Sequence, residues 1–313
     1  MRTMVTAEIL PEAVPALPGG EASPGGLRSG VRMLAELTRA RISLAVALSA
    51  ATGNLLAERR FSTGLLIPMA GVFLLACGSS VLNQVQETSI DARMRRTMNR
   101  PIPSGRLSRA WGLVIAIAFL GLGFSVLTSG EASPWPVLGL GAFSIAWYNG
   151  LYTPLKKWTA FAVVPGALVG AIPPLIGWSA AGLPLEAPAF PCAAFFFLWQ
   201  IPHFWLLMDW RDYEAAGLPT PARHFSEDQI AHITFMWILA VGASGVFLGV
   251  LEGFSPVWTA AIVTGSAGLC WRAIQYLRAD RTRIASRKMF MVINLYALIV
   301  MICLSGNAIS SVR

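Results

Sequence analysis

The chain has 313 residues, of which 55% are hydrophobic and only 13% are charged, and its mean hydropathy is +0.60. Soluble domains carry about 25% charged residues, so this composition excludes an ordinary soluble domain and indicates a protein of the lipid bilayer. The formal net charge of +8 does not indicate a nucleic-acid partner, because the basic residues cluster between apolar segments, as they do in the cytoplasmic loops of membrane proteins.

Residues 1–27 combine Pro, Gly, Ala and Glu without an apolar period. The segment lacks the apolar core of a signal peptide, so we expect a disordered N-terminal tail. We expect the remainder, residues 28–313, to form one polytopic domain.

Nine apolar segments follow, and each has about the length that crosses a bilayer as a helix, roughly 20 residues. They predict an all-α membrane protein with about nine transmembrane helices. Glycines and prolines interrupt the fourth and fifth segments. The predicted spans are 40–58, 64–84, 109–128, 134–150, 159–178, 188–208, 230–251, 256–277 and 289–308.

The distribution of basic residues predicts the orientation of these spans. With a cytoplasmic N-terminus, only Arg59, Arg60 and Arg313 of the 24 basic residues lie outside, and the opposite orientation reverses this bias. We therefore expect the N-terminus in the cytoplasm and the C-terminus outside. The two acidic segments, 83–105 and 209–214, then lie at cytoplasmic helix ends and can face each other across one cavity.

The second span continues into the polar segment 83–105, NQVQETSIDARMRRTMNRPIPSG. Asn83, Glu87 and Asp91 are four residues apart, so on a helix they share one face. Two carboxylates and an amide suit Mg²⁺, which prefers oxygen ligands. The arginines that follow, among them Arg96 and Arg100, suit phosphate oxygens. The segment therefore predicts a diphosphate site, with a plain cytoplasmic connection as the alternative.

A smaller polar group follows the fourth span. Tyr152 and Lys156 are four residues apart, and both can reach a phosphate from the same cytoplasmic rim. The alternative is an interfacial tyrosine beside a topology-setting lysine.

The sixth span is expected to be interrupted by Pro202, with His203 directly after it. Asp209 and Asp212 are three residues apart, so we expect them to share a helix face and, with Tyr213, to form a second cation site opposite the first. Two ions held from two helices can bracket a diphosphate and stabilise it as a leaving group. The alternatives are ordinary interface residues and a histidine that satisfies a carbonyl freed by the proline.

A different class of function is also consistent with two acidic segments. Transporters often consist of paired halves, so a carrier or a haem-binding membrane partner without catalysis is an alternative. A diphosphate-ionising site favours an enzyme, because a carrier has no need of one. Release of diphosphate separates the two classes.

Longer motifs in the chain resemble the UbiA-type intramembrane prenyltransferases over roughly residues 36–305. The family's first acidic motif, NxxxDxxxD, corresponds to Asn83, Glu87 and Asp91, with Glu87 in place of the usual Asp. The other matching stretches are Met94–Gly105, Tyr152–Lys156, Pro173–Trp178, Phe197–Trp205 and Asp212–Pro219.

The resemblance implies helices around a central cavity open to the cytoplasmic side of the cell inner membrane, with Mg²⁺ as the cofactor. Asn83, Glu87 and Asp91 would hold the ion. Arg96, Arg100 and Lys156 would bind a diphosphate, Asp212 would belong to the second acidic motif, and His203 would lie on the acceptor side.

Within the family, the chain resembles members that transfer a farnesyl group from farnesyl diphosphate to a vinyl group of haem b, giving haem O. A haem A synthase or a terminal oxidase assembly would then be the recipient of the product. The second acidic motif is not a plain DxxxD, and the segment from His203 to Asp212 is shorter than usual. An aromatic, quinone-precursor or chlorophyllide acceptor therefore stays open as an alternative.

Overall fold

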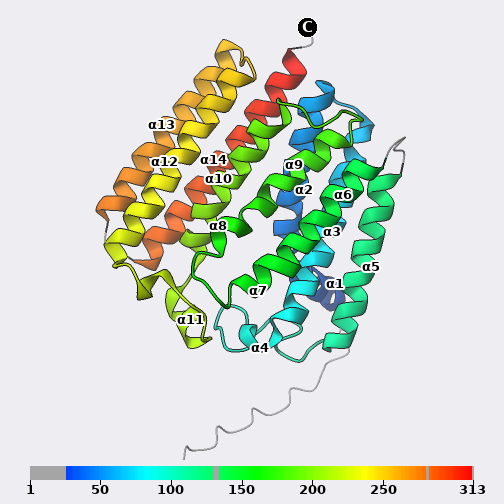
Figure 1. The fold of residues 1–313 in the computed structure, drawn as a ribbon, viewed down its shortest axis with the longest axis vertical. Coiled ribbons are helices and arrows are strands. Elements are labelled where there is room, and N and C mark those ends of the chain that lie inside the picture. The colour runs from blue at the N-terminus through cyan, green and yellow to red at the C-terminus, as the bar shows by residue number, and fades with distance from the viewer. Residues whose placement is uncertain (1–25, 130–133, 280–281, 312–313) are drawn as a thin grey trace, which may run out of the picture.

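A computed structural model describes residues 26–129, 134–279 and 282–311. Within these ranges the chain forms helices and no strand, which confirms the predicted all-α class. The predicted tail lies almost wholly outside the described residues, as does Arg313. The helices form one bundle, in which α12 and α13 lie at one edge and α5 at the other (Figure 1).

Seven helices in the described part of the chain are long and apolar enough to cross a membrane. They coincide with seven of the nine predicted spans, so the chain is a multi-pass membrane protein. One of these helices, α10, runs unbroken through Pro202, so the predicted interruption there is wrong; proline is tolerated inside membrane helices because neighbouring groups satisfy the freed carbonyl. The seven are α2 (Ala40–Glu58), α3 (Leu66–Gln86, preceded by the 3₁₀ turn η1, Thr63–Leu65), α5 (Arg109–Thr128), α10 (Ala189–Leu207), α12 (Glu227–Leu251), α13 (Pro256–Arg278) and α14 (Arg283–Ser310).

The predicted fourth and fifth spans are shorter and composite, so a count of nine full-length helices is not reached in the described residues. The fourth consists of α6 (Trp135–Ile145), the π-helical segment η2 (Ala146–Tyr152) and α7 (Thr153–Leu155). The fifth consists of α8 (Val163–Gly166) and α9 (Leu168–Ser179). Both interruptions fall where glycines and prolines predict them.

Four short helical elements lie outside the spans. Three of them, α1, α4 and α11, lie together with α7 at the end of the bundle opposite the C-terminus (Figure 1). This end carries all three polar segments that the sequence singled out. The short elements are α1 (Leu27–Leu37), α4 (Thr88–Asp91), α11 (Trp210–Ala215) and the 3₁₀ turn η3 (Pro221–Arg223).

Local sequence signals explain where several long helices begin. Ser108 caps α5 by accepting a hydrogen bond from the backbone amide of Trp111 at 3.2 Å. Ser226 and Gln229 form a reciprocal capping box at the start of α12. Thr282 caps α14 by accepting from the amide of Ala285. Each cap therefore sets the start of its helix at the polar boundary of the apolar run.

The contact between α2 and α9 is among the closest in the bundle. A Cβ atom at Gly53 would overlap the backbone carbonyl of Pro174, and one at Gly177 would overlap that of Ala50. The side chain of Asn54 donates to the Gly177 carbonyl at 3.1 Å, buried between the two helices. Small residues at such crossings let two membrane helices approach backbone to backbone. This contact therefore fixes the position of α2 relative to α9.

Candidate active site

The first acidic segment keeps its helical phase although α3 ends at Gln86. The amide of Glu87 donates to the Asn83 carbonyl at 2.9 Å, and the amide of Asp91 donates to the Glu87 carbonyl at 2.8 Å. These two bonds keep the i to i+4 spacing across the junction of α3 and α4, although Glu87 itself leaves helical dihedral angles (φ −103°, ψ 12°). Asn83, Glu87 and Asp91 lie 1%, 5% and 4% exposed, so the predicted common face is formed and is buried.

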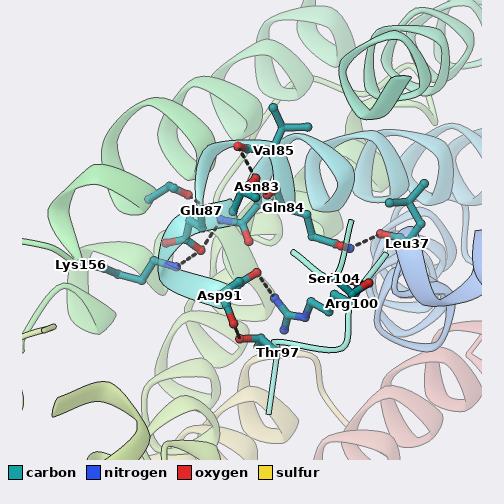
Figure 2. A network of polar contacts seen from close by, with 12 residues as sticks. Leu37, Asn83, Gln84, Val85, Glu87, Asp91, Thr97, Arg100, Ser104 and Lys156 are labelled. Atoms are coloured by element: carbon teal, nitrogen blue, oxygen red, sulfur yellow. Dashed lines mark hydrogen bonds and ion pairs between the residues drawn. The ribbon is translucent and has the colours of Figure 1, made fainter. Parts of the chain in front are cut away.

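Each of the two carboxylates has a cation beside it (Figure 2). The ammonium of Lys156 donates to Oε2 of Glu87 at 2.7 Å, and the Asn83 amide donates to the same oxygen at 2.8 Å. The guanidinium of Arg100 donates to Oδ2 of Asp91 at 2.7 Å. Charge-assisted contacts of this length are the strong ones, so the first acidic motif meets two of the three cations predicted to bind diphosphate, Lys156 and Arg100.

Both cations stay charged at neutral pH. Burial alone would lower the pKa of the Lys156 ammonium, but the adjacent Glu87 carboxylate raises that pKa above its ordinary value. Burial, with the neighbouring Arg39, lowers the pKa of the Arg100 guanidinium to about 10. Two positive charges therefore stand at a buried acidic face.

The oxygen atoms of this face fit a hard cation. In the described part of the chain, Oδ1 of Asn83, Oε1 of Glu87 and Oδ1 of Asp91 have no hydrogen-bond partner, because Asn83 uses its amide nitrogen and each carboxylate pairs through its other oxygen. Three free oxygens on one face match the preference of Mg²⁺. No group of three or more His, Cys, Asp or Glu side chains capable of holding a metal occurs in the described residues, so the amide of Asn83 is essential to this set.

The π-helical segment η2 places Lys156. Asn149 is bonded to α3 at both ends of its side chain: it accepts from the Ser79 hydroxyl at 2.5 Å and donates to the Gln86 side chain at 3.1 Å. Further along, the hydroxyl of Thr153 accepts from the Asn83 amide at 3.1 Å. These bonds hold the composite fourth span against α3, so Lys156 faces Glu87.

Tyr152 provides an apolar wall beside the charged network. The Lys156 ammonium lies 5.1 Å from the centroid of its ring. The ring packs directly on Gly166 of α8, where any Cβ would overlap it, and its centroid lies 6.1 Å from that of Phe204. The ring thus lies between the Lys156 ammonium and Phe204 of α10, and the predicted contact of Tyr152 with a phosphate stays a prediction.

His203 lies next along this row of rings, among three aromatic side chains. Its ring centroid is 5.7 Å from Phe204, 4.5 Å from Trp199 and 4.7 Å from Phe290. Its Nδ1 lies 3.1 Å from Oδ1 of Asn294 in α14, and Nδ2 of Asn294 donates to the Phe290 carbonyl. That second bond turns Oδ1 toward the histidine. With this orientation of Asn294, Nδ1 of His203 is the donor of the pair, and Nε2 has no hydrogen-bond partner among the described residues.

Asn294 was missed by the sequence analysis. It lies in the apolar part of α14, 91 residues from His203, and no local spacing connects the two. A polar residue within a membrane span is itself a signal, since it is retained only where it has a partner.

The two arginines predicted to bind a diphosphate, Arg96 and Arg100, have different surroundings in the basic loop after α4. Arg100 is partly buried and turned to Asp91, whereas Arg96 is exposed and has no ion pair or side-chain hydrogen bond in the described structure. The loop is bound to the acidic face at Thr97, whose hydroxyl donates to the Asp91 carbonyl at 2.9 Å. Only Arg100 thus joins the network.

The second acidic segment differs from its prediction. Asp209 is the extended residue before α11, so it does not share a helix face with Asp212, and its carboxylate pairs with Arg283 at 3.1 Å. Asp212 is buried and its carboxylate has no partner in the described residues. Tyr213 packs on the cluster that contains Ile90 of the first segment. The two segments therefore touch through apolar contacts, without a shared carboxylate cluster.

Comparison with known proteins shows the family to which this chain belongs. The model of the UbiA prenyltransferase family matches residues 42–294. The chain therefore belongs to the UbiA prenyltransferase family, and the resemblance noted from the motifs is confirmed.

Similar curated proteins share one name. The chain is 44% identical over 195 residues to the protoheme IX farnesyltransferase of Oleidesulfovibrio alaskensis, covering 61% of this chain and 68% of that one. It is 40% identical over 234 residues to the protoheme IX farnesyltransferase of Geobacter sulfurreducens, covering 72% and 85%. A UbiA homologue from Archaeoglobus fulgidus, solved bound to GPP and Mg²⁺, has the same fold, with a TM-score of 0.64 at 14% identity over 89% of this chain and 99% of that one.

Proposed function

We propose that this protein transfers the farnesyl group of farnesyl diphosphate to a vinyl group of haem b, giving haem O and diphosphate. The observation that carries the proposal is the buried face of Asn83, Glu87 and Asp91 with Lys156 and Arg100 against it, in a chain 40% identical to a protoheme IX farnesyltransferase. The face offers what a diphosphate leaving group requires, namely oxygens for a divalent ion and cations for phosphate.

Mg²⁺ bound at Asn83 Oδ1, Glu87 Oε1 and Asp91 Oδ1 would neutralise charge on the departing diphosphate. Lys156 and Arg100 stand on the opposite oxygens of the same carboxylates, so they can turn to phosphate oxygens without leaving the site. Asp212, buried and without a cation beside it in the described residues, is proposed to serve as the acidic group of the second motif. Fixed charges of this kind stabilise a developing anion in a water-poor pocket.

The reaction begins as the bond between C1 of the prenyl chain and the diphosphate oxygen breaks, with the electron pair leaving on oxygen. The terminal carbon of the vinyl group then attacks C1. The cation formed on the carbon next to the porphyrin takes up water and releases one proton to solvent. No strong protein base is needed, and Tyr152 and Phe204 offer aromatic faces beside the developing positive charge.

His203 is proposed to bind the acceptor. Its free Nε2 can donate a lone pair to the iron of haem b, which is the substrate here, and the rings of Trp199 and Phe290 suit a flat apolar macrocycle. The row Lys156, Tyr152, Phe204, His203 connects this pocket with the acidic face.

The proposed location is the cell inner membrane, with the N-terminus cytoplasmic and the C-terminus outside. This assignment is supported by the basic residues, which concentrate in the connections at the end that carries the site. Haem A synthase or a terminal oxidase assembly is the proposed recipient of the product.

The test is a membrane assay with farnesyl diphosphate, haem b and Mg²⁺, analysed by mass spectrometry for haem O and by a phosphate assay for released diphosphate, with and without a chelator. Chelator-sensitive formation of both products is expected. If haem b stays intact but diphosphate is released when an aromatic, quinone-precursor or chlorophyllide acceptor is added, the protein is a prenyltransferase with that acceptor instead of haem b. Absence of diphosphate release with every acceptor would indicate a carrier.

A further inference from the structure

A recess of about 760 Å³ lies between α1 and the basic loop that follows α4. It is separate from the acidic face, although Arg100 borders both. Four arginines line it: Arg32 of α1, and Arg96, Arg100 and Arg106 of the loop.

The charge of the recess is strongly positive. Glu36 is the one acidic residue in its lining, and it is shared by Arg32 at 3.2 Å and Arg106 at 3.0 Å. Arg96 has no anionic partner in the described structure, and Arg100 pairs with Asp91 outside the recess. The recess therefore offers an excess of guanidinium groups to an incoming anion.

Arg106 is held in place before any ligand arrives. Its Nε donates to the Ser104 hydroxyl at 3.2 Å, and one terminal nitrogen donates to the Asn99 carbonyl at 2.6 Å and to Glu36. A guanidinium fixed in this way loses little freedom on binding, and its other terminal nitrogen keeps two donors for a phosphate oxygen.

The opposite face of α1 indicates the depth of the recess in the membrane. Val31 and Leu34 are apolar yet 60% and 43% exposed, which in a membrane protein places them against lipid. Arg32 and Glu36, on another side of the same helix, line the recess. A helix with one apolar and one charged side lies along the membrane surface, at the level of the phosphate groups.

We propose that this recess binds the phosphate headgroup of an anionic membrane lipid, and that the bound lipid fastens α1 to the loop bearing Arg100. The acyl chains would extend along the apolar face of α1, and the phosphate would bridge Arg32, Arg96 and Arg106. Basic clusters at this depth attract anionic lipids of the cytoplasmic leaflet. The proposal does not depend on the reaction assigned above.

The test uses the full-length protein in detergent and in nanodiscs of phosphatidylcholine with or without phosphatidylglycerol. Bound lipid is counted by native mass spectrometry for wild type, for Arg32→Gln/Arg106→Gln and for the matched control Arg93→Gln/Arg95→Gln. The control removes two exposed arginines of the same loop that do not line the recess. Thermal unfolding in phosphatidylcholine alone verifies that all three fold.

We expect the control to retain phosphatidylglycerol and the Arg32/Arg106 variant to lose about tenfold or more of its affinity. Equal retention by the two double variants would overturn the proposal. Displacement of the lipid by inorganic diphosphate in wild type, with no preference for phosphatidylglycerol over phosphatidylcholine, would instead assign the recess to a soluble phosphate group and would also overturn it. Haem O formation by wild type, measured in parallel, reports on the proposed reaction independently of either result.

Discussion

The two acidic segments of this protein each carry two predicted metal-binding carboxylates but have different structures. In the first, Glu87 and Asp91 are both buried and each meets a cation, Glu87 from the distant Lys156 and Asp91 from Arg100 in the loop that follows. In the second, Asp209 lies before its helix and forms an ion pair with Arg283, while Asp212 is buried alone. Spacing predicts geometry only where the helix continues between the residues.

The ion pairs of the two segments also lie in different electrostatic environments. The side chains of Lys156 and Glu87 are 15% and 6% exposed, so their attraction is little screened by solvent. The side chain of Arg283 is 77% exposed in its pair with Asp209, so that contact is worth little. We therefore expect substitutions in the first segment to have much larger effects.

The largest effect is expected for Asp91→Asn. The variant keeps the shape of the side chain but removes the charge that faces Arg100 and the proposed ion, so turnover should fall by about 100-fold or more. Haem O formation measures it, with membrane content and thermal unfolding as the fold control. Normal turnover in a folded Asp91→Asn protein would remove Asp91 from the metal role.

The next effect concerns stability. Lys156→Met leaves the Glu87 carboxylate buried without its cation, which should lower the free energy of unfolding by about 3 kcal/mol. In the double variant Lys156→Met/Glu87→Gln no unpaired charge remains, so most of that stability should return while activity stays lost. Thermal unfolding of the three proteins in one detergent measures this. A double variant as unstable as Lys156→Met would refute the pairing.

A smaller and more selective effect is expected at Asn294. Asn294→Leu removes the acceptor that holds the proton on Nδ1 of His203, so affinity for haem b should fall by about tenfold. Asn294→Asp keeps an acceptor and should retain most of the affinity. Titration followed by the haem Soret absorbance gives both values, and the KM for farnesyl diphosphate should not change. Equal haem affinity in Asn294→Leu and wild type would contradict the positioning role.

The smallest effect is expected for Asp209→Asn. Its ion pair is exposed on the Arg283 side, so stability should change by less than about 1 kcal/mol and turnover by less than about twofold. The same assays used for Asp91→Asn apply. A loss of turnover comparable to that of Asp91→Asn would show that Asp209 turns from Arg283 to the substrate, and the contrast between the segments would then disappear.

Much of the fold was predictable because apolar length decides it. Seven of the nine predicted spans correspond to long helices, and the two composite ones fall where proline and glycine interrupt the pattern. The shared face of Asn83, Glu87 and Asp91 was predictable from spacing, since hydrogen bonds continue across the end of α3.

Contacts between distant segments could not be predicted in the same way. No spacing relates Lys156 to Glu87, or Asn294 to His203, since these pairs depend on how whole helices pack. The position of Asp209 was mispredicted because nothing in the local pattern shows that the chain leaves α10 at Met208 and begins a new helix at Trp210. The role of Tyr152 as a wall, too, depends on Gly166 lying under its ring.

The π-helical segment at Ala146–Tyr152 has one more consequence, which concerns how the backbone is wound rather than which side chains it carries. A π-helical turn accommodates more residues than an α-helical turn, so it behaves as a local insertion in an α-helix. If the same residues were wound as an ordinary α-helix, the extra residue would no longer be absorbed and everything downstream would be rotated by about 100°. Lys156 would then leave Glu87 with every side chain intact. The pairing of these two residues thus depends on the winding of a segment that contains neither of them.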